Sequence, residues 1–230
     1  MKNIFKAMAF LLITVWFVSC HEITTEDVTR ITYYPSITIL GDELAIIIKG
    51  TAYTDAGCTV DLNGKDVTDQ VITVSNVNPN AVGMYSVTYT AVNEDGFSVS
   101  ARRDVFVVNP NSFASVYWGE SMYGVRHYYD APILIKERSD GTYLIDDLAG
   151  GFYFWGRYPG YEDAGYDFHL EAILKLEADN TITLVKLGSW YWNSTAMSMT
   201  SGTFDPDTQT IKFNLVFGGS PMQVILTGVQ

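Results

Sequence analysis

Residues 84–108 read MYSVTYTAVNEDGFSVSARRDVFVV, and this stretch indicates the fold class. Between positions 85 and 91, Tyr85, Val87, Tyr89 and Ala91 alternate with serine and threonine, a pattern typical of a strand with one buried face. The Asn-Glu-Asp-Gly sequence at 93–96 is a strong hairpin turn. The stretch therefore predicts two antiparallel strands joined by a tight turn.

Similar apolar runs precede this hairpin. From Ile31 they recur about every ten residues, with turn residues between them. They are SITIL, ELAIIIKG, TVDL and QVITVSNV. Strands of this length and spacing predict an antiparallel β-sandwich over residues 31–108.

Residues 31–108 resemble the bacterial immunoglobulin-like domains that act as spacers in secreted and surface proteins. The likeness rests on PSITILG at 35–41, GTAYTDAG at 50–57, GMYSVTYTAV at 83–92, Asp-Gly at 95–96 and Arg-Asp-Val at 103–105. It implies a domain that holds another part of the chain away from a surface. Asp55, Asp61 and Asp66 lack the alternating spacing of a calcium loop, so we interpret them as turn and loop acids.

A second β-rich region, residues 113–230, follows the Asn-Pro-Asn-Ser linker at 109–112. Two hairpins are predicted, by ILKLEADNTITLVKL at 173–187 and by GTFDPDTQTIKFNLVFG at 202–218, and PMQVILTGV at 221–229 predicts a final strand. In the second hairpin Ile211, Phe213, Leu215 and Phe217 would share one face. No amphipathic helix is evident. We expect an all-β chain whose second domain is a closed or nearly closed antiparallel barrel or sandwich.

This second region resembles the C-terminal domains of uncharacterised Bacteroidetes surface lipoproteins that carry an immunoglobulin-like domain. The residues that carry the likeness are GTYLIDDLAGGFY at 141–153 and GTFDPDTQTIKF at 202–213. Relatives of this architecture are often encoded with outer-membrane glycan-uptake machinery. The resemblance implies a setting and supplies no functional residues.

The first residues differ from the rest of the chain. Lys2 and Lys6 flank the apolar run AMAFLLITVWFV at 7–18, which predicts a secretory signal peptide over residues 1–19. Ser19-Cys20 resembles the end of a bacterial lipobox, which implies lipidation of Cys20 and a tether over residues 20–30. An ordinary signal peptide with an incidental cysteine is the alternative. A doubly acylated Cys20 would anchor the protein stably in the outer membrane, at the cell surface or on the periplasmic face.

Charge and cysteine content narrow the choice of partners. The net charge is −12, and no basic stripe is present, which excludes a nucleic-acid partner. Neutral molecules or cations are favoured. Cys58 is the only cysteine besides Cys20, so lipidation of Cys20 leaves no intrachain disulfide, and we expect Cys58 to be buried.

Aromatic side chains concentrate in the second region. Residues 113–230 contain 21 aromatics in 118 positions, against 7 in 81 for residues 28–108. Sugars stack their apolar C–H faces on such rings, so an exposed group is a candidate carbohydrate platform. The candidates for stacking are Trp155, Tyr158, Tyr161, Trp190 and Trp192, with Arg157 as a hydrogen-bond donor. Packing of these rings in the core or rim of a barrel is the alternative.

The local pattern predicts how these rings are oriented. A strand at 152–155 would put Tyr153 and Trp155 on one side and the two phenylalanines on the other. Residues 156–161, GRYPGY, indicate a loop because Gly and Pro interrupt them. In SWYWN at 189–193 the two tryptophans would share a face, and Tyr191 would oppose them.

Other chemistry has weaker support. Asp167, His169 and Glu171 would share one face of a strand, but residues two apart on one strand do not close around a metal ion. We interpret them as a polar outer face. Glu162-Asp163 would supply only half of a glycosidase carboxylate pair. The sequence contains no P-loop, dinucleotide-binding or nucleophile-elbow motif, so we expect no metal, no cofactor and no catalysis.

These observations lead to one expected function and two alternatives. We expect a lipid-anchored envelope protein that binds a polysaccharide or oligosaccharide without catalysis, beside outer-membrane uptake proteins. The first alternative is a structural or adhesive surface protein without a small-molecule site. The second is a glycoside hydrolase.

Overall fold

The structure is a computed structural model that describes residues 31–230. The predicted signal peptide, Cys20 and the tether at 20–30 lie outside the described residues. Within residues 31–230, no helix has the length and apolar character needed to cross a membrane.

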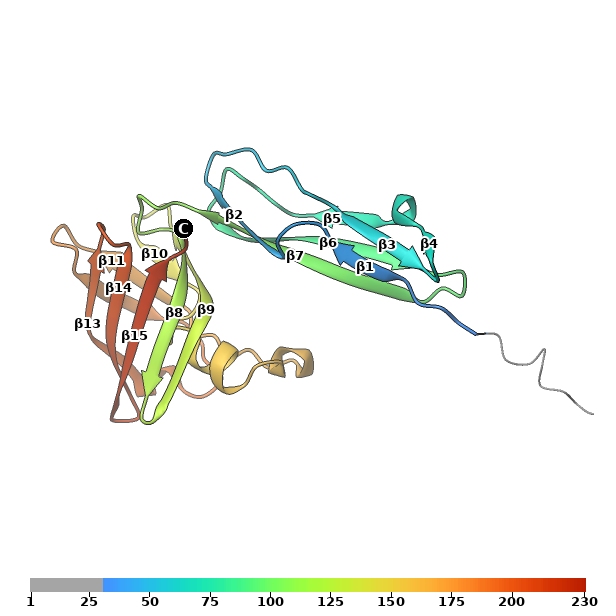
Figure 1. The fold of residues 1–230 in the computed structure, drawn as a ribbon. Helices are drawn as coiled ribbons and strands as arrows, with labels where there is room; N and C mark the ends of the chain where they lie inside the picture. Colours follow the sequence, from blue (N-terminus) through green and yellow to red (C-terminus); the bar gives the residue numbers. More distant parts are fainter. Residues whose placement is uncertain (1–30) are drawn as a thin grey trace, which may run out of the picture. The chain divides into compact units, whose positions relative to one another are not determined.

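The first domain is a sandwich of two sheets, as predicted (Figure 1). One sheet contains β1 (Ser36–Ile39), β3 (Cys58–Leu62) and β4 (Lys65–Asp66), and the other contains, in spatial order, β2 (Leu44–Ile48), β7 (Ser98–Val108), β6 (Gly83–Val92) and β5 (Ile72–Ser75). The predicted alternation along β6 is confirmed, because Val87, Tyr89 and Ala91 are buried in the core between the sheets. Cys58 is buried with them and is a free cysteine.

The prediction of a purely antiparallel sandwich is wrong at one edge. β2 pairs with β7 in parallel, with Ile46 opposite Phe106. Parallel strands require a crossover between them. Here the long segment that carries β3 to β6 provides it, and spacing of apolar runs alone does not show such a crossover.

Residues from three of the Ig-like motifs meet at the buried Arg103. Its guanidinium donates to the Asp55 carboxylate and to the backbone carbonyls of Leu40 and Asp42. The Tyr89 hydroxyl donates to the same carboxylate at 2.5 Å. Asp55 is therefore part of an internal polar network.

The other two acids considered for calcium serve turns. Asp61 accepts the Gly64 amide at 2.9 Å, and Asp66 accepts the Thr68 amide at 2.9 Å. Among residues 31–230, no group of three or more potential metal ligands comes together.

The second domain is a nearly closed antiparallel barrel of eight strands (Figure 1). In spatial order these are β12 (Ile182–Leu187), β11 (Ala172–Leu176), β10 (Tyr143–Ile145), β9 (Arg126–Glu137), β8 (Val116–Tyr123), β15 (Ser220–Gly228), β14 (Thr210–Phe217) and β13 (Met197–Asp205). Thr181 forms an isolated bridge with Thr203, and Phe204 donates its amide to Asn180 at 2.9 Å. These contacts bring the first and last strands of the sheet together at one end. Both predicted hairpins and the final strand are confirmed.

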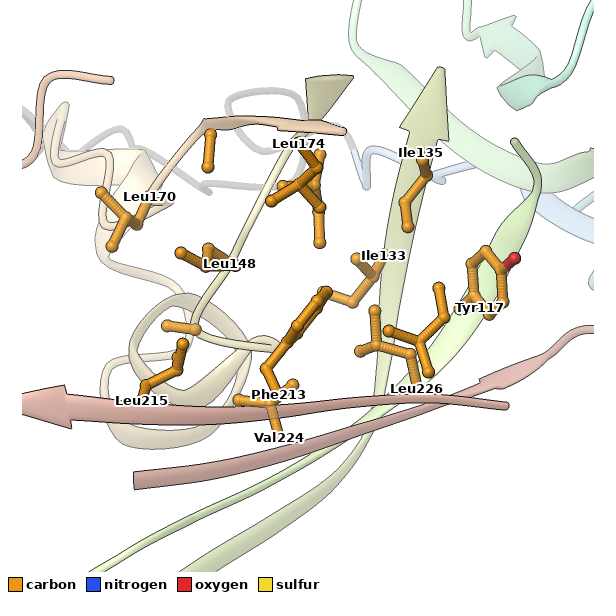
Figure 2. Packing of buried hydrophobic residues seen from close by; sticks show 14 of the residues in the cluster. Tyr117, Ile133, Ile135, Leu148, Leu170, Leu174, Phe213, Leu215, Val224 and Leu226 are labelled. Carbon is orange, nitrogen blue, oxygen red and sulfur yellow. The ribbon is translucent and has the colours of Figure 1, made fainter. Parts of the chain in front are cut away.

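The barrel interior is filled with side chains (Figure 2). Tyr117, Ile133, Leu174, Phe213 and Leu226 come from five different strands and are fully buried. The predicted face of β14 is confirmed, because Ile211, Phe213 and Leu215 point inward. With its interior packed in this way, the barrel has most of its exposed rings on loops.

A third, smaller cluster of buried residues involves the end of β7. Phe106 and Val108 pack with Val116, Leu134 and Val229. The partly buried linker at 109–112 is thus bordered by apolar packing on β7 and β8.

Candidate functional site

Two loops carry most of the exposed aromatic rings of the barrel domain, and strand β9 carries one more, Tyr129. The first connects β10 to β11, and the second connects β12 to β13. Both loops lie at the same end of the barrel, because neighbouring strands alternate in direction and only the short β11–β12 turn separates the two connections. The barrel mouth at that end is a usual place for a ligand site.

A buried carboxylate fixes the first loop at both its ends. Asp147 is fully buried and accepts the amides of Ala149 at 2.9 Å, Gly151 at 3.0 Å and Leu170 at 3.2 Å. Removal from water raises the pKa of Asp147 to about 6. Because one side chain binds both the start and the end of the loop, the residues between them leave and rejoin the barrel at defined positions.

The prediction of a strand at 152–155 is wrong. Phe152–Arg157 form a π-helical turn, η4, that begins after Gly151. Gly150 and Gly151 have φ angles of 62° and 81°, in the left-handed region that a β-strand does not enter. Phe152 and Tyr153 are consequently both buried and Trp155 is exposed, where a strand would have put Tyr153 and Trp155 on the same side.

Five rings from the two loops form one group, here called the aromatic cluster: Tyr161, Tyr166, Phe168, Tyr191 and Trp192. Phe168 is buried at its centre. Tyr166 lies parallel to it at 6.0 Å between ring centroids, Trp192 stacks on it at 4.9 Å, and Tyr191 meets it edge-on at 5.0 Å. The tyrosines are 41–55% exposed and Trp192 is 37% exposed, so the rings around Phe168 present a shared aromatic surface to solvent.

The structure divides the six predicted site residues into three groups. Tyr161 and Trp192 belong to the aromatic cluster. Tyr158 is half-buried beneath it, 5.1 Å from the Phe168 ring, and the Arg157 guanidinium lies 5.2 Å from the Tyr158 ring centroid. These four residues lie together.

Trp190 and Trp155 have different surroundings. Trp190 packs against Tyr153 and Phe217 beside the barrel core and donates its indole N–H to the Phe168 carbonyl at 3.0 Å. It is a rim residue that supports the cluster from behind. Trp155 is exposed, and its ring contact is with Phe154.

The predicted site residues do not include three members of the cluster, which are the buried Phe168 and the exposed Tyr166 and Tyr191. Tyr191 was expected to oppose the tryptophans, but residues 188–193 form no strand, and Tyr191 lies 5.3 Å from the Trp192 ring. For Tyr166 the available sequence signal is its alternation with buried Phe168, because residues two apart in an extended segment lie on one side.

Asp167, His169 and Glu171, which alternate with apolar residues, lie on the side of segment 166–171 that faces away from the buried residues. Residues 166–171 are not part of a strand, yet Phe168 and Leu170 are buried while Asp167 and Glu171 are exposed. His169 is half-buried, contacts the Asp167 carboxylate through Nδ1 at 2.8 Å and stacks on Phe154 at 3.7 Å. These contacts account for His169 as part of the loop structure.

Comparison with known proteins defines the chain's family. A family model described as a "-like, C-terminal domain" matches residues 108–228, slightly more than half of the chain. The chain belongs to the family that this C-terminal domain defines. In this member the domain follows a match to the bacterial surface protein, Ig-like domain family at residues 37–107. None of the curated proteins compared with the chain matches it.

A solved lipoprotein structure matches the chain over both domains. The crystal structure of the lipoprotein BT2262 from Bacteroides thetaiotaomicron is 27% identical, has a TM-score of 0.60, and the match covers 85% of this chain and 100% of that one. Together with the Ig-like match, it indicates a surface-exposed lipoprotein for this family member.

Two further solved structures are much less similar. A Clostridium perfringens ZmpB structure with a CBM51-2 domain in complex with GlcNAc is 11% identical, with a TM-score of 0.27 over 85% of this chain and 44% of that one. A Bacteroides ovatus protein of unknown function is 10% identical, with a TM-score of 0.25 over 85% of this chain and 93% of that one. Similarities this weak support no conclusion about the function of this chain.

Proposed function

We propose that the protein binds a glycan, without catalysis, at the aromatic cluster. The observation that carries the proposal is that two loops from one end of the barrel bring Tyr161, Tyr166, Tyr191 and Trp192 together around Phe168 with their rings partly exposed. A group of exposed rings on a packed scaffold suits the C–H faces of a sugar, and the tyrosine hydroxyls and the Trp192 N–H offer hydrogen bonds to sugar hydroxyls.

The scaffold supports binding because it fixes the rings in advance. Asp147 holds both ends of the first loop, and Trp190 links the second loop to the Phe168 carbonyl. Rings that are already ordered lose little conformational freedom when a ligand binds.

The proposed setting is the outer membrane, where lipidated Cys20 would anchor the chain and the Ig-like domain would act as a spacer. Polysaccharide-uptake proteins of the same membrane are the proposed partners. A structural or adhesive protein is the second candidate. The observation in its favour is that every ring of the cluster packs against other rings, as in an apolar patch that binds another protein.

Single-ring variants of soluble residues 21–230 test the proposal. Tyr191→Ala and Tyr161→Ala each remove one exposed ring and should weaken retardation in polysaccharide affinity gels about threefold to tenfold, since one aromatic contact contributes ~0.5–1.5 kcal/mol. Trp155→Ala is the matched control, because it removes a similarly exposed ring whose contact is with Phe154. Thermal unfolding of each variant checks that it is folded.

The outcomes separate the two candidates. Retardation by one polysaccharide that both tyrosine variants lose and the Trp155→Ala variant keeps supports glycan binding at the cluster. If a broad panel of polysaccharides leaves the folded wild-type protein unretarded, glycan binding is wrong, and the adhesive or structural role takes its place.

A further inference from the structure

The first of the two loops that carry the aromatic cluster has a strongly acidic exposed surface. Glu162, Asp163, Asp167 and Glu171 are all exposed on the first loop, and the second loop, residues 188–196, contains no charged residue. Arg157 is the only lysine or arginine on either loop, and its guanidinium lies against the Tyr158 ring.

Two of these carboxylates lie between two cluster rings along the chain. Glu162 and Asp163 follow Tyr161 on one short 3-10 turn, η5 (Tyr161–Ala164), and Tyr166 follows this turn. Consecutive Cα atoms are about 3.8 Å apart, so the backbone positions of Glu162 and Asp163 lie within about 8 Å of that of Tyr161. At physiological ionic strength charges influence one another over about 8 Å, which includes a ligand that rests on Tyr161.

Such carboxylates act differently on neutral and anionic sugars. A neutral sugar can donate its hydroxyls to Glu162 or Asp163, and hydrogen bonds with an ionised acceptor are stronger than those between neutral groups. A uronate or sulfate offers a like charge at the same place, and a polymer offers one at each repeat. The single guanidinium near the cluster does not balance the four exposed carboxylates of the loop.

We infer that the cluster selects uncharged glycans and rejects polyuronates and sulfated polysaccharides, and that Glu162 and Asp163 provide the rejection. This inference rests on the glycan binding proposed above and names its substrate class. It gives the acidic turn a role in specificity, where the sequence had suggested only half of a hydrolase's carboxylate pair.

Matched polymers with one backbone and different charge test the inference. Soluble residues 21–230 would be run in affinity gels that contain one polymer each, and a non-binding acidic protein would serve as mobility reference. The pairs, with the neutral member first, are hydroxyethylcellulose and carboxymethylcellulose, dextran and dextran sulfate, and methyl-esterified and de-esterified homogalacturonan. We expect the neutral member of the retained pair to bind about threefold to tenfold more strongly, with a smaller difference at about 0.5 M salt, at which exposed charges are largely screened.

The charge variants assign the effect to the turn. Glu162→Gln/Asp163→Asn should reduce the discrimination, whereas Asp69→Asn/Asp207→Asn, which removes two exposed charges outside both loops, should leave it unchanged. Equal or stronger binding of the anionic member overturns the inference while the proposed function stands. An equal effect of the two double variants, or no effect of the first, also overturns it. Retardation by no polymer at all removes the proposed function and the inference together.

Discussion

At the scale of single residues, Arg103 shows why the Ig-like motifs occur together. Its side chain is 3% exposed, yet it pairs with Asp55 and binds two backbone carbonyls near the turn at residues 40–43. A guanidinium presents several donors in a fixed planar arrangement, which suits this set of acceptors. The network thereby ties β7 to the two segments that flank β2.

Replacing Arg103 should destabilise the first domain strongly. Arg103→Ala leaves Asp55 and the carbonyls without their donor, and loss of one partner of a buried pair costs about 3 kcal/mol. Arg102→Ala is the adjacent control, because Arg102 pairs with Asp104 on the surface, where such a pair contributes ~0–1 kcal/mol. Denaturant unfolding measures both changes. A difference of less than about 1 kcal/mol between the variants would show that the network contributes little.

At the scale of elements, the π-helical turn η4 depends on a close approach of backbone to strand β9. A Cβ atom added at Gly151 would lie 2.1 Å from the Cβ of Ala131, and the φ angle of Gly151 is 81°. Gly160, between η4 and η5, has the same φ angle but no atom within 4 Å of an added Cβ. The two glycines therefore separate the effect of steric contact from that of backbone strain.

Gly151→Ala should be much more damaging than Gly160→Ala. Both variants incur the left-handed backbone cost of about 1–2 kcal/mol, and Gly151→Ala adds a clash inside the barrel that costs about 1–3 kcal/mol more. Denaturant unfolding gives the stabilities, and tryptophan fluorescence reports whether the loop around Trp155 is altered. Equal losses in the two variants would contradict the packing explanation.

The strands were more predictable from the sequence than the loops that carry the site. Alternation along β6 and β14 follows directly from burial of one face, and the turns at 93–96 and 205–207 follow from local Gly, Asn, Asp and Pro chemistry. The position of Tyr191 depends on its contact with Phe168, and the turn η4 depends on the close approach of Gly151 to β9. Both contacts join residues that are distant in sequence. A local pattern carries no information about such contacts, and the parallel pairing of β2 is a further example.

At the scale of the whole molecule, two neighbouring carboxyls influence how stability responds to pH. Burial raises the pKa of Asp146 to about 7 and that of Asp147 to about 6, above the usual value for an unfolded chain. A raised folded-state pKa means that the folded protein holds the proton more tightly. The stabilising contribution is therefore complete below about pH 4 and is lost as the pH rises through 6 to 7.

We accordingly expect the free energy of unfolding to increase by about 1–2 kcal/mol when the pH falls from about 7.5 to about 5. Most of the increase should come from Asp146. Its carboxylate accepts one amide, that of Leu134, whereas Asp147 accepts three amides, which favour the ionised form of Asp147. Acids with lowered pKa values, such as Asp55, remain ionised in this range, so their contribution changes only at lower pH. Urea unfolding at several pH values across this range measures the trend. Asp146→Asn should flatten this dependence of stability on pH, whereas Asp207→Asn, at an exposed position, is the control and should preserve it. A fall in stability on acidification over the same range would contradict the assignment.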